Sequence, residues 1–320
     1  MCIRDRVYTP APPHGFEDLP TGADLILDPP LIHRHFPFLS KDVIAALHTR
    51  RCGRMSAQQL GMYMLERARE CGTRLLCARV EGVDVQDGRV RAVRLSDGSG
   101  SRTIATDTFV NAAGPFVKQV GDLVGVDLPV YCELHAKIAY NDSLGIIPQS
   151  APLYYWADPQ RLPWSDEERA LLAESEEMQW LLEPFPPGPH GLPEGTPGSR
   201  SQLCLWTYDI ETVEPVVPLP PLDPHYFEVV LRGLSRMIPG LQAYFDRLPR
   251  PVVDGGYYAK TRENRPLIGP LPVKGAYIIG ALSGFGIMAG CGAGELLAAH
   301  VTGGEVPSYA HWFLLERYED

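Results

Sequence analysis

The sequence predicts a mixed α/β (α+β) fold made of two domains, and three observations indicate it. A strand, a glycine-rich turn and an apolar helix follow one another over residues 276–303, an order typical of α/β domains. A capped amphipathic helix and a β-hairpin occupy residues 56–98. Between these regions, ELHAKIAYND and SQLCLWTYDIE alternate like strands of a separate antiparallel sheet. A chain of 320 residues is long enough for two such domains.

The composition excludes several classes of protein. Hydrophobic residues make up 45% of the chain and charged residues 21%, as in globular proteins. With 39 acidic and 29 basic residues the net charge is −10, and no Lys/Arg block is present to bind phosphates, so we expect no nucleic-acid partner. The seven cysteines are scattered without a C-x-x-C motif. We therefore expect neither disulfides nor a metal site, and a cytoplasmic location.

The first 23 residues contain no targeting signal. MCIRDR is charged and aperiodic, is followed by a proline-rich stretch, and lacks the apolar region of a signal peptide. The hexapeptide resembles translated sequencing-adapter sequence. We therefore expect residues 1–23 to be a disordered or non-native leader, and the natural protein to begin upstream.

An uncharged run over residues 276–294 is long enough to cross a bilayer. Six glycines within it make a continuous spanning helix unfavourable, and no Lys/Arg asymmetry flanks it. We interpret the run as a buried strand, a glycine turn and a buried helix, and expect no membrane span.

The first half of the chain shows clear local patterns after a loop and short helix at residues 24–47. Ser56 and Gln59 form a capping-box pattern, and apolar residues then recur at helical spacing until Gly72 ends the helix. Asp87-Gly88 predicts a hairpin turn. The two strands that it joins are expected over residues 73–86 and 89–98.

A third strand is expected over residues 103–114, followed by a helix over 115–125 that begins at Pro115. This strand ends in Asn111-Ala112-Ala113-Gly114, whose small residues leave the backbone uncovered. Either a flat ligand approaches this turn or it is a simple connection between strand and helix.

The second half contains a long insertion over residues 148–200. A helix is expected over 165–182, and the tract over 184–198 is rich in turn residues. We expect the insertion to be a surface excursion or lid. An amphipathic helix over 225–241 ends at Pro239-Gly240, and the chain then returns to the C-terminal strand and helix.

The glycine turn carries the main functional signal. The residues from Gly284 to Ala289 fit G-x-G-x-x-G/A between a strand and a helix, but too little chain follows for a second strand with its acidic residue. What remains is a helix N-terminus whose N–H groups favour an electron-rich ligand. Tight helix–strand packing is the alternative. A hydrolase nucleophile at Ser283 is excluded, since Ala281 and Phe285 replace the required glycines.

Together these residues resemble the FAD-dependent oxidoreductases of the D-amino-acid oxidase, glycine oxidase and sarcosine oxidase superfamily. The resemblance extends over residues 28–309 and is most specific in VNAAGPF, GYYAKTRENRPLIGP and GALSGFGIMAG. It implies an FAD-binding, Rossmann-like domain over residues 24–128 and 251–320. An antiparallel-sheet substrate domain would cover residues 129–250, with the insertion inside it. The first βαβ unit of the family, with its G-x-G-x-x-G, is not in this sequence, so we expect an N-terminally truncated fragment.

The resemblance also implies roles for individual residues. Val80 falls where relatives bind the adenine. The remaining cofactor-binding positions lie beside the FAD or against the flavin ring: Ala112, Ala113, Gly114, Gly284, Phe285, Gly286, Ile287 and Met288. Tyr258 falls at a substrate-contacting position, and Arg262 and Arg265 are nearby cations able to hold a carboxylate. For both arginines an ion pair with Glu263 is the alternative.

Three positions depart from the family pattern. Relatives with covalent flavin have a cysteine where Gly256 stands, so we expect non-covalent FAD at this position. Met288 replaces a lysine of sarcosine oxidases, which argues against sarcosine as substrate. Thr261-Arg262-Glu263 stands where relatives commonly have Thr-Pro-Asp.

The function implied is oxidation of the C–N bond of an amino acid or a secondary or tertiary amine, with hydride transfer to flavin N5. The expected partner is that small molecule; the electron acceptor and the oligomeric state are left open. Two alternatives are a catalytically silent flavin-binding scaffold or assembly factor, and an NAD-linked dehydrogenase. Four tryptophans are either pocket lining or core residues: Trp156, Trp164, Trp180 and Trp206.

Overall fold

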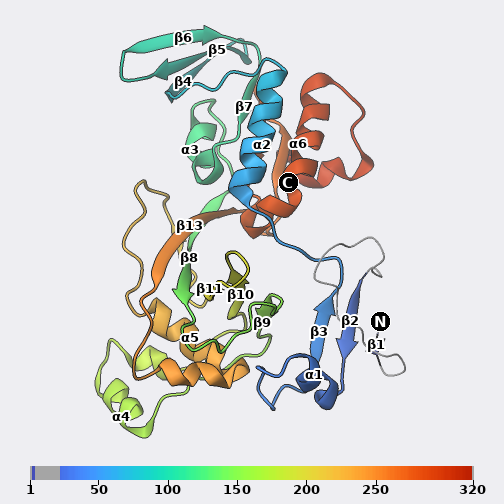
Figure 1. Ribbon diagram of the computed structural model, residues 1–320. Helices are drawn as coiled ribbons and strands as arrows, with labels where there is room; N and C mark the ends of the chain where they lie inside the picture. Colours follow the sequence, from blue (N-terminus) through green and yellow to red (C-terminus); the bar gives the residue numbers. More distant parts are fainter. Residues whose placement is uncertain (1, 4–21, 319–320) are drawn as a thin grey trace. The chain divides into compact units, whose positions relative to one another are not determined.

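The chain divides into two units in the computed structural model, which describes residues 2–3 and 22–318 (Figure 1). Unit 1 comprises Met1–Arg54, Ala136–Ile210 and Pro220–Gly255, and unit 2 comprises Met55–His135, Glu211–Leu219 and Gly256–Asp320. Strands β8 (Tyr131–Asn141) and β13 (Val252–Lys260) each contribute residues to both units. Residues 24–54 thus group with unit 1, and not with residues 55–128 as expected from the sequence.

The N-terminal part of unit 1 is a small three-stranded sheet, β1–β2–β3. Its strands are β1 (Cys2–Ile3), β2 (Ala23–Ile26) and β3 (Ala46–Thr49), and helix α1 (Pro29–His35) follows β2. The short helix expected in this region is confirmed, but the strands were not expected, because segments of two to four residues carry too little alternation to detect. Most of the expected leader lies outside the described residues.

The main sheet has the order β12–β8–β11–β10–β9, with β13 paired to β8. The remaining strands are β9 (Tyr154–Tyr155), β10 (His190–Glu194), β11 (Ser201–Leu205) and β12 (Thr212–Val213). β8 and β11 are antiparallel neighbours, with Cys204 opposite Ile138, so the two strands predicted here are confirmed. The insertion is not only a surface excursion, because β10, from its turn-rich tract, pairs with both β11 and β9.

Helix α5 (Tyr226–Met237) lies in the core of unit 1. Ten of its twelve residues are buried, so the amphipathic helix that the spacing predicts is also an interior helix. Gly233 allows this burial, since a Cβ there would overlap the ring of Trp206. The helix ends at Met237, just before the predicted Pro239-Gly240, and Pro239 opens a 3-10 turn that was not predicted, η3 (Pro239–Tyr244).

The tryptophans considered as pocket lining belong largely to this core. Trp206 is fully buried in it, and Trp156 and Trp164 are partly buried and pack against it. The indole Nε1 of Trp206 donates to the carbonyl of Pro186 at 3.2 Å. Trp180 is 40% exposed. The core interpretation is therefore confirmed for Trp206.

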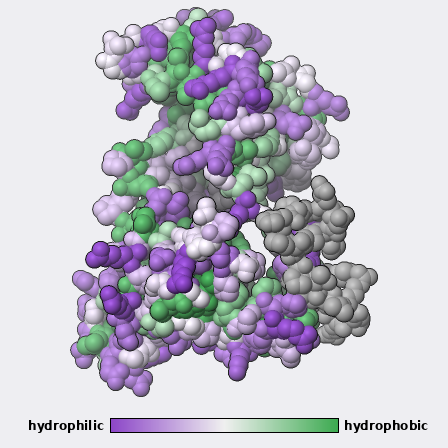
Figure 2. Space-filling view, in the orientation of Figure 1, coloured by the Kyte–Doolittle hydropathy of each residue, from purple (hydrophilic) through white to green (hydrophobic). Residues whose placement is uncertain are grey.

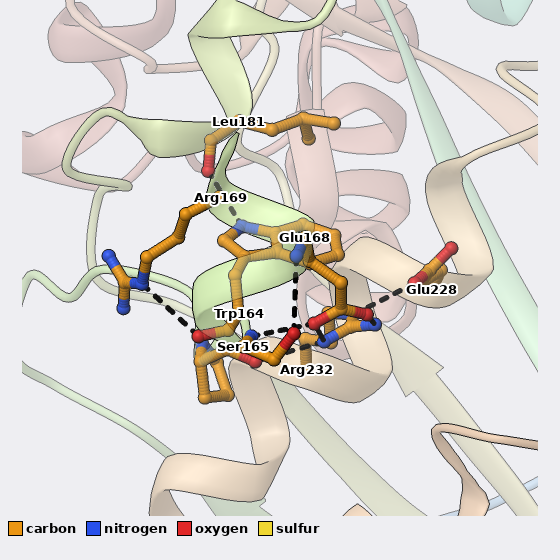
Figure 3. A network of polar contacts seen from close by, with 8 residues as sticks. Trp164, Ser165, Glu168, Arg169, Leu181, Glu228 and Arg232 are labelled. Atoms are coloured by element: carbon orange, nitrogen blue, oxygen red, sulfur yellow. Dashed lines mark hydrogen bonds and ion pairs between the residues drawn. The ribbon is translucent and has the colours of Figure 1, made fainter. Parts of the chain in front are cut away.

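The insertion is attached to the core through the buried Arg232 of α5 (Figure 3). Its helix α4 (Asp166–Glu174) starts with a capping box of Ser165 and Glu168, and the 3-10 turn η2 (Gln179–Leu182) follows. The Arg232 guanidinium donates to carboxylates of Glu168 and Glu228 and to the carbonyl of Pro163. It also lies 3.8 Å from the ring centroid of Trp164. One buried cation therefore joins the insertion to α5.

Unit 2 begins with helix α2 (Ala57–Glu70), which Ser56 caps by accepting a hydrogen bond from the Gln59 amide. The predicted hairpin is confirmed over β4 (Arg79–Gln86) and β5 (Arg89–Ser96), although residues 73–78 are not part of the strand. Its turn residues, Asp87 and Gly88, have φ values of 53° and 70°, the left-handed geometry of a tight hairpin. The single strand expected over 103–114 is wrong: β6 (Ser101–Ala105) pairs with β5, whereas β7 (Phe109–Asn111) joins another sheet.

That other sheet has the order β14–β15–β7, formed by β14 (Leu267–Pro270), β15 (Ala276–Gly280) and β7. β15 is antiparallel to β14 and parallel to β7. The helical segments of this region are η1 (Gly114–Phe116), α3 (Val117–Asp122), η4 (Ser283–Phe285), α6 (Gly286–Thr302), η5 (Ser308–Phe313) and η6 (Leu315–Tyr318). The mixed α/β fold with antiparallel sheets is therefore confirmed.

The long apolar run folds into strand β15, a turn and helix α6, but the expectation of a buried helix is wrong, because only Ala293 and Leu296 of α6 are buried. Among the described residues, Ser283–Thr302 is the one helix long and apolar enough to cross a membrane by length and composition, and 11% of its most apolar window is buried. Met288, in its first turn, is 73% exposed. Figure 2 shows hydrophobic residues exposed among hydrophilic ones on the face drawn.

Replacing Arg232 with Met should lower the free energy of unfolding by about 2 kcal/mol, because two carboxylates and a carbonyl lose their common donor while remaining partly shielded from water. Urea denaturation followed by tryptophan fluorescence measures the change. Arg236→Met is the matched control, since Arg236 is exposed on the same helix. Equal stabilities of the two variants would contradict the assigned role of Arg232.

Candidate flavin site

Two turns meet at one edge of the β14–β15–β7 sheet. β7 and β15 are parallel neighbours, with Asn111 opposite Ile278, so their carboxyl ends lie side by side. The turn at residues 112–114 leaves the end of β7, and the glycine turn at residues 281–286 leaves the end of β15. Ligands of α/β sheets bind at the carboxyl ends of strands. The structure therefore brings together the two motifs that the sequence presents 170 residues apart.

The side chain of Asn111 holds the turn after β7 through two hydrogen bonds. This side chain is buried, its Nδ2 donates to the carbonyl of Val117 at 2.7 Å, and its Oδ1 accepts from the amide of Ala113 at 3.3 Å. Gly114 has a φ of 58°, which favours glycine. Ala112 and Gly114 are exposed. The backbone of the turn is thus held rigidly and is open on its outer side.

The glycine turn carries an unusual backbone. Ala281 and Ser283 have φ values of 54° and 52°, in the left-handed region that non-glycine residues rarely adopt. Such conformations cost about 1–3 kcal/mol each and cluster at functional sites. They direct the chain from β15 into η4 and α6, neither of which has a side chain that caps its N-terminus. The first-turn N–H groups therefore face their surroundings without a side-chain acceptor.

Tyr258 of β13 contacts this turn. A Cβ placed on Gly284 would lie 2.9 Å from Cε2 of Tyr258, closer than real Cβ atoms approach other atoms. Glycine at position 284 is therefore required by the tyrosine ring. The structure thus places Tyr258, predicted to contact substrate, directly beside the turn predicted to contact the flavin.

Three polar residues, of which Glu133 is buried and His135 and Lys260 are half-buried, surround Tyr258 and were not predicted. The ring of His135 stacks on that of Tyr258 with centroids 3.8 Å apart and planes 14° apart. Oε2 of Glu133 is 2.8 Å from Nε2 of His135 and accepts a hydrogen bond from Nζ of Lys260 at 2.5 Å. The signal in the sequence is the two-residue spacing within each strand, Glu133 with His135 and Tyr258 with Lys260, which places each pair on one face.

The protonation states of this group follow from its contacts. Burial acts to raise the pKa of Glu133, but hydrogen bonds from Lys260 and His135 outweigh it, and the pKa is lowered overall. Burial lowers the pKa of His135, and the charge of Lys260 lowers it further against the opposing effect of Glu133. At neutral pH Glu133 is therefore a carboxylate and His135 a neutral imidazole.

The two arginines predicted near the substrate are not paired with Glu263. Instead, Oε1 of Glu263 accepts from Nε of Arg317 at 2.7 Å. Arg262 is exposed in the turn after β13, and the guanidinium of Arg265 lies 4.9 Å from the ring centroid of Trp312. The ion-pair alternative for these arginines is therefore wrong, and contact of either one with a substrate remains a prediction.

The predicted cofactor residues all belong to unit 2, but they do not form one cluster. Residues 112–114 and 284–288 share the sheet edge described above. Val80 lies in the other sheet, on β4, opposite Leu95 and beside a break in strand register at Gly82. Its predicted contact with adenine stays a prediction.

A sequence comparison with protein families matches residues 16–300 to the model described as FAD dependent oxidoreductase. The match covers most of the 320 residues. This chain therefore belongs to the FAD-dependent oxidoreductase family, as the sequence motifs suggest. No protein with a curated description matches the sequence.

Solved structures show the same fold. L-proline dehydrogenase from P. horikoshii is 20% identical with a TM-score of 0.67, and the match covers 93% of this chain and 69% of that one. Glycine oxidase from Geobacillus kaustophilus is 15% identical with a TM-score of 0.66, covering 93% and 68%. Iminodiacetate oxidase from Chelativorans sp. BNC1 is 20% identical with a TM-score of 0.65, covering 93% and 69%. The expected fold family, an enzyme family, is thereby confirmed.

Substituting Gly284 with Ala should displace the Tyr258 ring, because the new methyl group has no room. We expect a loss of about 1–3 kcal/mol in stability and a changed NMR signal of the tyrosine ring. Gly286→Ala is the control, since the nearest atom to its Cβ would be 3.9 Å away. If both variants leave the tyrosine signal unchanged, the close contact at Gly284 does not exist in solution.

Proposed function

We propose that this protein oxidises the C–N bond of an amino acid or of a secondary or tertiary amine, using FAD as electron acceptor. The observation that carries the proposal is the contact of Tyr258 with the glycine turn, at the uncapped N-terminus of α6. This places a predicted substrate-contacting side chain beside backbone N–H groups suited to an electron-rich ligand.

The residues at the sheet edge fit a flat cofactor. A Cβ added at Gly114 or Gly290 would meet no atom within 4 Å, so the backbone is open at both positions. The turns at 112–114 and 284–288 would hold the isoalloxazine end of FAD, and Val80 the adenine. Gly256 offers no thiol, which supports non-covalent binding at this position. When bound, FAD supplies the acceptor for the hydride that leaves the carbon next to nitrogen.

The chain itself contributes electrostatics and positioning. The N-terminus of α6, which no side chain caps, would stabilise negative charge in front of it through the helix dipole. Tyr258 orients the substrate, and Arg262 and Arg265 are cations for a carboxylate if the substrate has one. We name no general base, because an amine that binds in its neutral form requires none. Unit 2 would bind the cofactor, since all the predicted cofactor residues belong to it.

The substrate class is supported by the solved structures of similar fold. Their names describe proteins that act on L-proline, glycine and iminodiacetate. Each of these compounds carries an amine next to a carbon that can be oxidised. Met288, where sarcosine oxidases have a lysine, supports a substrate other than sarcosine.

Adding FAD to the purified chain and following flavin absorbance without oxygen tests this proposal. A panel of amino acids and amines should include at least one compound that bleaches the flavin. Tyr258→Leu should slow bleaching about tenfold or more while FAD still binds, because substrate orientation is lost. Tyr309→Phe is the control, since Tyr309 is 56% exposed.

The possible outcomes separate the alternatives. If FAD binds but no compound bleaches it, the catalytically silent scaffold is favoured. If FAD does not bind, the cofactor assignment for this chain is overturned. If Tyr258→Leu bleaches as fast as Tyr309→Phe, Tyr258 does not position the substrate.

A further inference from the structure

We propose that Glu133, His135 and Lys260 form a positioning unit that sets the orientation of Tyr258 at the glycine turn. The inference rests on the proposed function for its catalytic consequence, but its structural part is testable without cofactor. All four side chains belong to unit 2.

The orientation of Tyr258 depends on contacts of its ring. Among residues 22–318 its hydroxyl has no hydrogen-bond partner, so no polar contact fixes it. The ring of Tyr258 instead stacks on the ring of His135, with the two centroids 3.8 Å apart. It also packs against Gly284, which leaves room for it because glycine has no Cβ. A stacked aromatic pair contributes beyond its buried area, but only while both planes keep their relative orientation. The plane of His135 therefore determines the plane of Tyr258.

The plane of His135 is in turn fixed by Glu133. The imidazole Nε2 lies 2.8 Å from Glu133 Oε2, and both side chains are less than 10% exposed. Because this nitrogen donates to the carboxylate, the ring is held in one tautomer and one orientation. Neighbouring groups that hydrogen-bond an imidazole in this way commonly orient it in metal and catalytic sites.

The ion pair with Lys260 offsets the free-energy cost of burying the Glu133 carboxylate. A carboxylate removed from water without a partner is strongly unfavourable. The side chains of Glu133 and Lys260 are 7% and 17% exposed, and the Lys260 ammonium donates to the same Oε2 that contacts His135. One oxygen atom thus joins both strands, with Lys260 and Tyr258 on β13 and Glu133 and His135 on β8.

The same ion pair has a consequence for specificity. Because Glu133 neutralises Lys260, this lysine is not an anchor for a substrate carboxylate. The residues next to Tyr258 therefore carry no net charge, and their role is to position the tyrosine and not to bind an anion.

NMR of the histidine side chains in the chain without FAD tests the structural part. The His135 ring protons should be shifted upfield by the stacked Tyr258, and the assignment follows from loss of the signal in His135→Gln. Tyr258→Leu should abolish the shift, and Glu133→Gln and Lys260→Met should each reduce it by half or more. Lys260→Arg, which keeps the charge, should restore it. Lys137→Met is the control, because Lys137 is exposed on β8, the strand of Glu133 and His135.

Kinetics with bound FAD and a bleaching amine test the catalytic consequence. Lys260→Met should lower the bleaching rate at saturating amine about tenfold, with the Kd for FAD unchanged, and Lys260→Arg should recover most of it. An unchanged His135 shift in both Glu133→Gln and Lys260→Met would overturn the proposal. So would a reduced shift with an unchanged bleaching rate. If no amine bleaches the flavin, the proposed function fails, and the NMR result alone still decides whether the unit holds Tyr258.

Discussion

The structure of the candidate site depends on one constraint: the N-terminus of α6 must remain free of side chains where the chain leaves β15. Glycine at 284 and 286 meets this constraint, and neither η4 nor α6 has a capping side chain. The strained backbone at Ala281 and Ser283 turns the chain sharply enough to present these N–H groups at the sheet edge. Most helices hide this end with a cap. Here we propose that its exposure stabilises a ring that gains negative charge when it is reduced.

The elements around the turn serve to hold it in place. The parallel pairing of β7 with β15 brings the Ala112–Gly114 turn to the same edge, and buried Asn111 fixes that turn. On another side, Tyr258 packs where Gly284 leaves room for it. The polar side chains of Glu133, His135 and Lys260 are largely shielded from water, whereas the residues of the glycine turn itself are small or apolar. Neighbouring residues thus hold the glycine turn in place, and its glycines leave the backbone accessible to a ligand.

The sequence predicted those features that are encoded locally. The Ser56 cap, the Asp87-Gly88 turn and the strand–turn–helix at the C-terminus each depend on a few adjacent residues. Features that depend on distant pairing were missed. β10 lies in a proline-rich tract and forms only because β11 and β9 flank it. The contact of Glu133 with Lys260 exists only because β8 pairs with β13. Likewise, the partner of Glu263 is Arg317, far along the chain.

The proposed contact between the flavin and the N-terminus of α6 can be measured at the backbone amide of Gly286. Phe285-Gly286 is the only Phe–Gly pair in the sequence, so labelling Phe carbonyls with ¹³C and Gly amides with ¹⁵N yields one carbonyl-correlated NMR signal. On titration with FAD this signal should move in step with the quenching of flavin fluorescence. A signal that stays in place while the flavin binds would contradict the account.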